Sequence, residues 1–143
     1  MPARKPLGPQ DLMMKYSFFK NQLEQSVEEL KNLELIKGDH LAAKNTLESM
    51  KALRTDNESL LPIGGNTFLI TKVSDKDKVL VEVGSKVVMG RSVESALSRI
   101  ESLLDELGKR EKELVGNIQH SQSELEQIVP VLQSMERQAS QKQ

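Results

Sequence analysis

Residues 61–90 read LPIGGNTFLITKVSDKDKVLVEVGSKVVMG, a short block of β-type sequence punctuated by glycines. Its β-branched residues alternate or cluster in short runs bounded by turn-forming residues, which is typical of strands. The four expected strands are Leu60 to Ile63, Thr67 to Val73, Lys78 to Val83 and Lys86 to Met89. Residues 74–77, Ser-Asp-Lys-Asp, have the composition of a hairpin turn. The block as a whole predicts two consecutive β-hairpins.

Both flanks of this block carry apolar residues at alternating steps of three and four, the spacing that aligns side chains on one face of a helix. On the N-terminal side these are Leu12, Tyr16, Phe19, Leu23, Leu30 and Leu33, followed by a drift to Ile36, Ala43, Leu47, Met50 and Leu53. On the C-terminal side they are Leu97, Ile100, Leu104, Leu107, Leu114, Ile118, Leu125, Ile128, Leu132 and Met135, with Glu111 and Ser121 as interruptions. Two such stretches of similar length predict a long antiparallel coiled-coil hairpin around the β block.

The expected organisation is a single domain over residues 1–143, of the α+β class and mostly α. Its segments are a flexible lead-in at 1–8, a first helix at 9–57, two β-hairpins for assembly at 60–90, a second helix at 92–139 and a flexible tail at 140–143. Gly90 is expected to end the last strand, and Ser92 to cap the second helix. Pro130 lacks an amide donor, so a kink or an early helix end is expected there.

The composition excludes several classes of function. With 20 basic and 21 acidic side chains the net charge is −1, so the chain has no overall field to attract nucleic acid or an anionic membrane. It contains no cysteine, which excludes disulfides, thiolate metal clusters and a cysteine nucleophile. No apolar run is long enough for a membrane span or a signal peptide, so a cytoplasmic protein is expected.

No catalytic, cofactor-binding or metal site is expected, and the chain is not predicted to be an enzyme. His40 and His120 lie on different expected helices, without the spacing of metal ligands. The Gly64-Gly65-Asn66 run lacks the rest of a phosphate-binding loop, so it indicates a turn. Asp75 and Asp77 begin a calcium-loop spacing without its glycine or closing glutamate, and are also expected in a turn.

The β block is expected to assemble with other subunits. A lone hairpin is marginally stable in water and leaves its strand edges unpaired, so four short strands on a thin coiled coil require more sheet. Other subunits are the simplest source of that sheet. The residues expected to mediate assembly are Ile63, Phe68, Ile70, Val79, Val81, Val83 and Val87.

The ends of the two arms are expected to bind apolar partners. An antiparallel hairpin brings both chain ends to its far tip, where helix pairing frays and seam residues lose their partners. The candidate residues there are Leu12, Met13, Met14, Tyr16, Phe18, Phe19, Ile128, Val129, Val131, Leu132 and Met135. The alternative is that they complete the coiled-coil core, which fits Tyr16, Phe19, Leu132 and Met135 better than the residues outside the stripe.

The layout of arm, two β-hairpins and arm resembles the α-class subunits of prefoldin. The matching residues are Leu61 to Phe68 at the entry to the first hairpin, Val79 to Gly84 in the second, and Val93 to Leu97 at the start of the closing helix. The resemblance implies a hexamer in which two such subunits and four single-hairpin β-class subunits close their strands into a β-barrel platform. It also implies ATP-independent capture of unfolded polypeptides at the tips and their delivery to a group II chaperonin.

Two other functions remain open from the residues. One is a homo-oligomeric or filamentous prefoldin-like structural assembly, in which the hairpins join identical subunits. The other is a coiled-coil adaptor without a chaperone role, whose β block merely caps the hairpin. A nucleic-acid-binding coiled coil ranks below these because the chain has no basic arm.

Overall fold

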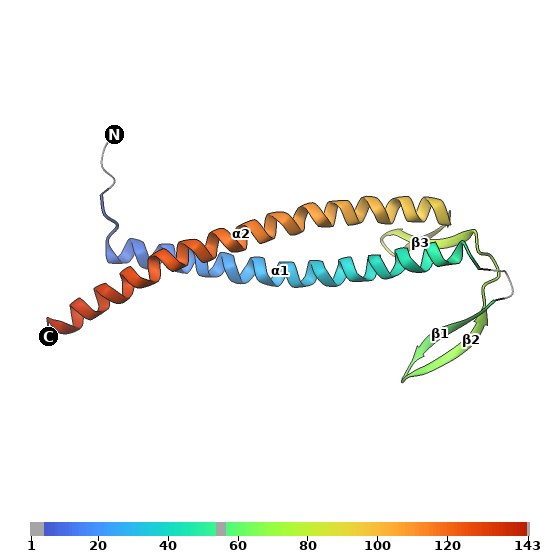
Figure 1. The fold of residues 1–143 in the computed structure, drawn as a ribbon, viewed down its shortest axis with the longest axis horizontal. Coiled ribbons are helices and arrows are strands. Elements are labelled where there is room, and N and C mark those ends of the chain that lie inside the picture. Colours follow the sequence, from blue (N-terminus) through green and yellow to red (C-terminus); the bar gives the residue numbers. More distant parts are fainter. Residues whose placement is uncertain (1–4, 54–56, 143) are drawn as a thin grey trace. The chain divides into compact units, whose positions relative to one another are not determined.

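A computed structural model of the protein describes residues 5–53 and 57–142 (Figure 1). The elements are α1 (Pro9–Met50), β1 (Glu58–Gly64), β2 (Thr67–Lys72), β3 (Lys78–Gly84), β4 (Val87–Ser92) and α2 (Val93–Gln141). Two long helices therefore flank four short strands, which confirms the mostly α fold class. The chain divides into two compact units: unit 1 holds the residues up to Leu35 and from Gly108 onward, and unit 2 holds Ile36–Leu107.

In unit 1 the two helices are antiparallel. The Lys15 Nζ atom lies 2.7 Å from Glu124 Oε2, and farther along α1 an Arg110 Nη atom lies 2.7 Å from Glu29 Oε1. As the residue number rises along α1, the number of its partner on α2 falls. The core nearest the chain ends consists of buried Leu12, Phe19 and Ile128, with Tyr16, Leu125, Leu132 and Met135 packed against it.

The interface between the two helices of unit 1, here called the seam, follows the heptad spacing. Ser121, predicted as an interruption of the apolar stripe, occupies one of its positions. On α1 every seventh residue from Leu12 to Leu33 is buried, and on α2 the same holds for Leu114, Ser121 and Ile128. Ser121 is 0% exposed, and its Oγ lies 3.4 Å from the amide oxygen of Gln22. The small hydroxyl side chain is therefore an integral seam residue, since a weak hydrogen bond offsets part of its desolvation cost.

In unit 2 the predicted drift of the apolar stripe on α1 is wrong at its first two residues, while Leu47 is buried as predicted and Met50 packs against the core. Ile36 is 47% exposed and Ala43 is also exposed, whereas the polar residues Lys37, His40 and Lys44 take the half-buried positions. The seven-residue spacing therefore continues here, because pairing with α2 holds the helix to a 3.5-residue repeat even where the sequence offers apolar residues elsewhere.

The first helix ends earlier than predicted. α1 stops at Met50, not at residue 57, and the chain continues in a tighter turn in which the amides of residues 51–53 bond to carbonyls three residues back. Such bonds satisfy carbonyls that an α-helix leaves free at its end. Residues 54–56 lie outside the described residues, and β1 begins at Glu58, before the predicted residue 60.

The second helix begins as predicted but ends later. The Ser95 amide donates to Ser92 Oγ at 3.1 Å, which confirms the predicted cap. Gly90, however, does not end the last strand, because β4 continues through it to Ser92. α2 also passes through Pro130 to Gln141, so the predicted early end and the start of a tail at residue 140 are wrong. Packed residues on both sides of Pro130 hold the helix, which outweighs the loss of one backbone bond.

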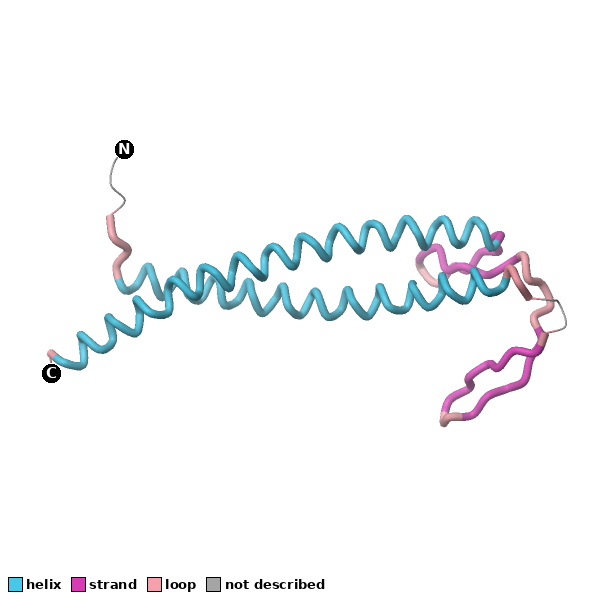
Figure 2. Tube along the Cα trace, in the orientation of Figure 1, coloured by secondary structure: helices cyan, strands magenta, loops and turns pink. Residues whose placement is uncertain are grey.

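The strands form two separate antiparallel hairpins, β1 with β2 and β3 with β4 (Figure 2). Residues 74–77 are therefore not a hairpin turn, as predicted, but the link between the hairpins. This link is fixed by two hydrogen bonds of 2.9 Å, from the Asp77 amide to Asp75 Oδ1 and from the Val93 amide to the Asp77 carbonyl. The actual turns lie at Gly65-Asn66 and Ser85-Lys86.

The two hairpins use the same tight turn. Each has two central residues with positive φ, 55° at both Gly65 and Asn66, and 49° and 61° at Ser85 and Lys86. Two-residue turns of this kind match the right-handed twist of the strands and favour Asn-Gly sequences. The first turn has residues that tolerate the conformation, but the second places a lysine where its Cβ is strained.

Replacing Lys86 by glycine is expected to stabilise the second hairpin by about 1 kcal/mol, since glycine adopts positive φ without the steric cost. Hydrogen exchange of the β3 and β4 amides measures the gain. The control is Lys78→Gly on β3, where the same change in extended backbone should reduce protection. If both variants lost protection from hydrogen exchange, the Ser85-Lys86 turn would not be strained.

In unit 2 the helix ends and the second hairpin share a core. Leu47, Val93, Ala96 and Leu97 are buried, and Val79 and Val81 of β3 pack against them. Along β3 exposure alternates, with Val79, Val81 and Val83 half-buried. The first hairpin differs, because all its residues except half-buried Thr71 are exposed. In the ranges 5–53 and 57–142, neither helix is apolar enough to cross a membrane.

Candidate functional site

The predicted tip residues separate into a core and an exposed group. Leu12, Phe19 and Ile128 are buried, and Tyr16, Val129, Leu132 and Met135 are half-buried. The exposed group, here called the tip patch, consists of Met13 (49% exposed), Met14 (72%), Phe18 (60%) and Val131 (43%). These are the residues outside the helical stripe, so their exposure follows from the heptad pattern. Large apolar side chains at such exposure are available for a partner.

One residue of the tip patch, Phe18, contacts the buried aromatic residue of α1. Met14 and Phe18 are four residues apart and share one face of the helix. The Phe18 ring meets Phe19 edge to face, with centroids 5.2 Å apart and an angle of 79°, and Phe19 meets the ring of His120 in the same way at 5.6 Å. Core packing therefore supports the exposed Phe18 ring.

Charged residues link the helices beside the tip patch and farther along unit 1. Lys15 reaches Glu124 and also lies over the Phe19 ring, 5.7 Å from its centroid. Contact with the Lys15 ammonium, which outweighs burial, lowers the pKa of Glu124, whose Oε2 atom is buried. Hydrogen bonds to Glu29 and Glu113 raise the pKa of Arg110. The two pairs that cross between the helices, Lys15 with Glu124 and Arg110 with Glu29, favour one register.

The lowered pKa of Glu124 predicts a pH-dependent contribution to stability. A carboxyl group with a depressed pKa stabilises the fold above its ordinary pKa, and this contribution is lost as the pH falls through the depressed value. Urea unfolding followed by helix content should therefore show Glu124→Gln less stable than the parent at pH 7, and the gap should narrow as the pH falls below the ordinary glutamate pKa of about 4.3. Glu126→Gln, an exposed change on the same helix, is the control. A gap that persists in acid would contradict the assignment.

The β-hairpins present a second apolar surface. In β1 and β2 the register places Leu60, Phe68 and Ile70 on one face and Leu61 and Leu69 on the other. Their exposed fractions range from 49% to 71%. A two-stranded sheet that is apolar on both faces and open at both edges needs a covering partner.

The residues predicted for assembly fall into two groups. Ile63, Phe68, Ile70 and Val87 are exposed, while Val79, Val81 and Val83 are half-buried, the first two against their own helices. The prediction omitted other exposed apolar residues of the hairpins, namely Leu60, Leu61, Leu69, Leu80, Val88 and Met89. Adjacent apolar residues in a strand point to opposite faces, so the Leu60-Leu61 pair could have indicated a two-sided surface.

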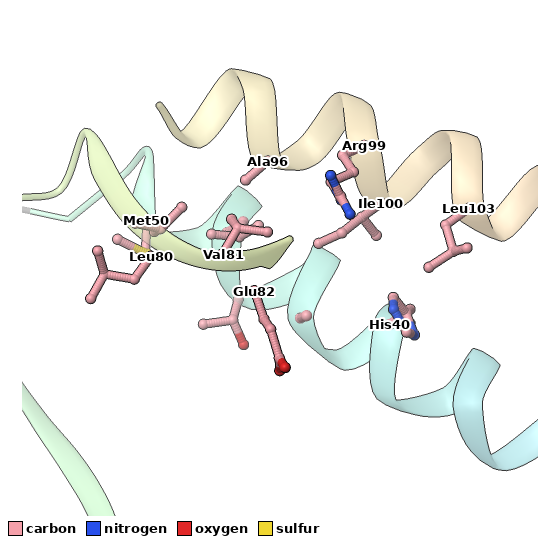
Figure 3. Close-up of a pocket in the computed structure, with 13 residues that line it drawn as sticks. His40, Met50, Leu80, Val81, Glu82, Ala96, Arg99, Ile100 and Leu103 are labelled. Atoms are coloured by element: carbon pink, nitrogen blue, oxygen red, sulfur yellow. The ribbon is translucent and has the colours of Figure 1, made fainter. Parts of the chain in front are cut away.

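A groove of about 610 Å³ lies beside β3 in unit 2, and Figure 3 shows the residues that line it. Its walls are mainly apolar side chains from three elements, including Met50 of α1, Val81 of β3 and Ile100 of α2. His40, Glu82 and Arg99 add polar groups. The volume is that of a ligand pocket, but the groove is open and continues the apolar surface of the second hairpin.

Comparisons with known proteins agree with this layout. The family of prefoldin subunits matches residues 19–140. Prefoldin subunit alpha of Methanoculleus marisnigri is 30% identical over the whole of this chain and 95% of its own length. The corresponding subunit of Pyrococcus horikoshii is 29% identical, covering 90% of this chain and 88% of its own.

A solved structure has the same fold. The cryo-electron microscopy structure of filamentous prefoldin from Methanocaldococcus jannaschii has a TM-score of 0.68 and 25% sequence identity, covering 82% of this chain and 97% of that one. Prefoldins are chaperone co-factors whose subunits assemble into oligomers with one another. Since the family match spans most of the sequence and the relatives are α subunits, this chain belongs to the prefoldin family, in its α class.

Proposed function

We propose that this chain is a subunit of an ATP-independent chaperone that captures unfolded polypeptides on the tip patch. The exposure of Met13, Met14, Phe18 and Val131 beside a complete core is the observation that carries the proposal. Flexible methionine side chains adapt to irregular apolar partners, which suits a surface that binds many sequences. The buried tip residues then act as the scaffold of the patch.

The proposed assembly contains two copies of this chain and four single-hairpin β-class subunits. Support comes from the first hairpin, whose two apolar faces and two open edges would be covered by strands of other subunits. Several weakly binding tips in one assembly would hold a polypeptide together, since each bound tip raises the effective concentration of the others.

The captured polypeptide is proposed to pass to a group II chaperonin in the cytoplasm. The single domain of residues 1–143 would supply only binding surfaces, and the sequence has no Walker pattern for nucleotide. A filamentous assembly of identical subunits is the second candidate, because the similar M. jannaschii chain belongs to a filamentous prefoldin.

Aggregation of a chemically unfolded client protein, followed by light scattering, tests the proposal. The assembled oligomer is expected to suppress aggregation without nucleotide, and a group II chaperonin with ATP is then expected to recover folded client. Unchanged scattering would contradict capture. Suppression without any recovery, in the presence of an active chaperonin, would contradict transfer while leaving capture intact.

A further inference from the structure

The sulfur groups of this chain are unevenly distributed. The sequence has six methionines and no cysteine, so thioethers are its only sulfur chemistry. Met50 and Met135 pack against the cores of units 2 and 1. Met13, Met14 and Met89 are exposed, at 49%, 72% and 47%. Met1 lies outside the described residues.

Two of the three exposed methionines are neighbours in the tip patch. Met13 and Met14 are consecutive on α1, and Met14 shares a helix face with the exposed Phe18 ring. Oxidation of a thioether requires access of the oxidant to sulfur, so these two side chains are open to attack, whereas the half-buried Met50 and Met135 are less accessible.

We infer that Met13 and Met14 form an oxidative modification site through which a peroxide reversibly weakens polypeptide capture, an inference that rests on the proposed function of the tip patch. A sulfur lone pair attacks one peroxide oxygen, the O–O bond breaks and an S–O bond forms. The second oxygen leaves as water with the two protons of hydrogen peroxide. The sulfur is oxidised by two electrons. A thiol-dependent reductase returns the sulfoxide to thioether and water while two thiols are oxidised to a disulfide.

The structure explains why such oxidation acts on capture and not on the fold. A sulfoxide is polar, so the tip patch would lose two of its four apolar side chains. Met50 and Met135 are half-buried against their cores, so they are less accessible than the exposed pair. Met89 lies on β4, which the proposed assembly covers with neighbouring strands. A mild oxidant would therefore alter the tips while the oligomer persists.

The experiment uses the assembled oligomer, treated with hydrogen peroxide in steps and quenched with free methionine. Peptide mapping by mass spectrometry locates added oxygen, native mass spectrometry follows the oligomer, and client aggregation measures capture. Met13 and Met14 are expected to gain oxygen before Met50 and Met135. The affinity for client is expected to fall about tenfold, which corresponds to about 1.4 kcal/mol of binding free energy. Methionine sulfoxide reductases with a thiol are expected to restore capture.

Two variants separate the site from general damage, each compared with its own untreated sample. The double variant Met13→Leu/Met14→Leu, which keeps apolar volume but cannot form sulfoxide, is expected to lose no capture on treatment. Met89→Leu is expected to remain sensitive. Equal loss in the double variant, or oxidation at both positions of the parent without loss of capture, would overturn the inference. An untreated oligomer that captures nothing would instead overturn the proposed function, and the regulation with it.

Discussion

Phe68→Asp is expected to leave the isolated chain folded and to abolish its assembly with other subunits. Phe68 is 54% exposed on β2, opposite Pro62, and contributes to neither buried core. Within the chain a charge there stays in water. In the proposed assembly the same charge would be buried against neighbouring strands, at a cost of several kcal/mol that strand pairing cannot offset.

Circular dichroism and native mass spectrometry would measure folding and assembly of this variant. The control is Ser74→Asp, which adds the same charge to the exposed link between the hairpins. Val81→Asp should behave differently, since Val81 packs against the core of unit 2 and its replacement damages the fold as well. An unchanged oligomer with Phe68→Asp would show that the first hairpin is not an assembly surface.

Met14→Ser/Phe18→Ser is expected to abolish most polypeptide capture without changing the oligomer. These are the two most exposed residues of the tip patch, so their loss removes apolar contact area from the client and little from the core. Burying one such side chain contributes roughly 1.5–3 kcal/mol, so losing two would weaken each tip by about a hundredfold or more. Multivalent binding amplifies the loss.

Light scattering of an aggregating client would measure this effect. Leu35→Ser is the matched control, because Leu35 is 70% exposed on the same helix and in the same unit but outside the tip patch. Equal loss of capture in the control would mean that exposed apolar residues along the helix bind the client, and not the tip patch in particular. Deleting the end of α2 would be less informative, since it removes Ile128 from the core.

Periodicity predicted most of the helical structure from sequence. The seam positions of α2 follow the three-and-four spacing closely enough that the pattern even includes Ser121, a buried polar residue. The periodicity failed between Ile36 and Ala43, because these apolar residues were assigned to the helix interface but are exposed. Helix pairing, which sequence propensity does not contain, decided the actual face.

The hairpins and the site were partly predictable. Strand positions followed from β-branched residues, and the first turn followed from Gly64-Gly65-Asn66. The second turn did not, because Ser85-Lys86 lacks the usual Asn-Gly signal and Ser74–Asp77 has a turn composition without being the hairpin turn. At the tips, the stripe separated Phe19 from Phe18 correctly. At the hairpins, the alternation of apolar residues did not predict which valines pack against the helices of their own subunit. That depends on tertiary packing, which the strand pattern does not contain.

Native mass spectrometry of this chain, alone and mixed with a single-hairpin β-class subunit from the same cell, distinguishes the hetero-hexamer from an assembly of identical subunits. A mixed hexamer of two copies of this chain and four partners is expected. A ladder of homo-oligomers that the partner does not change would contradict the hexamer and favour the filamentous assembly.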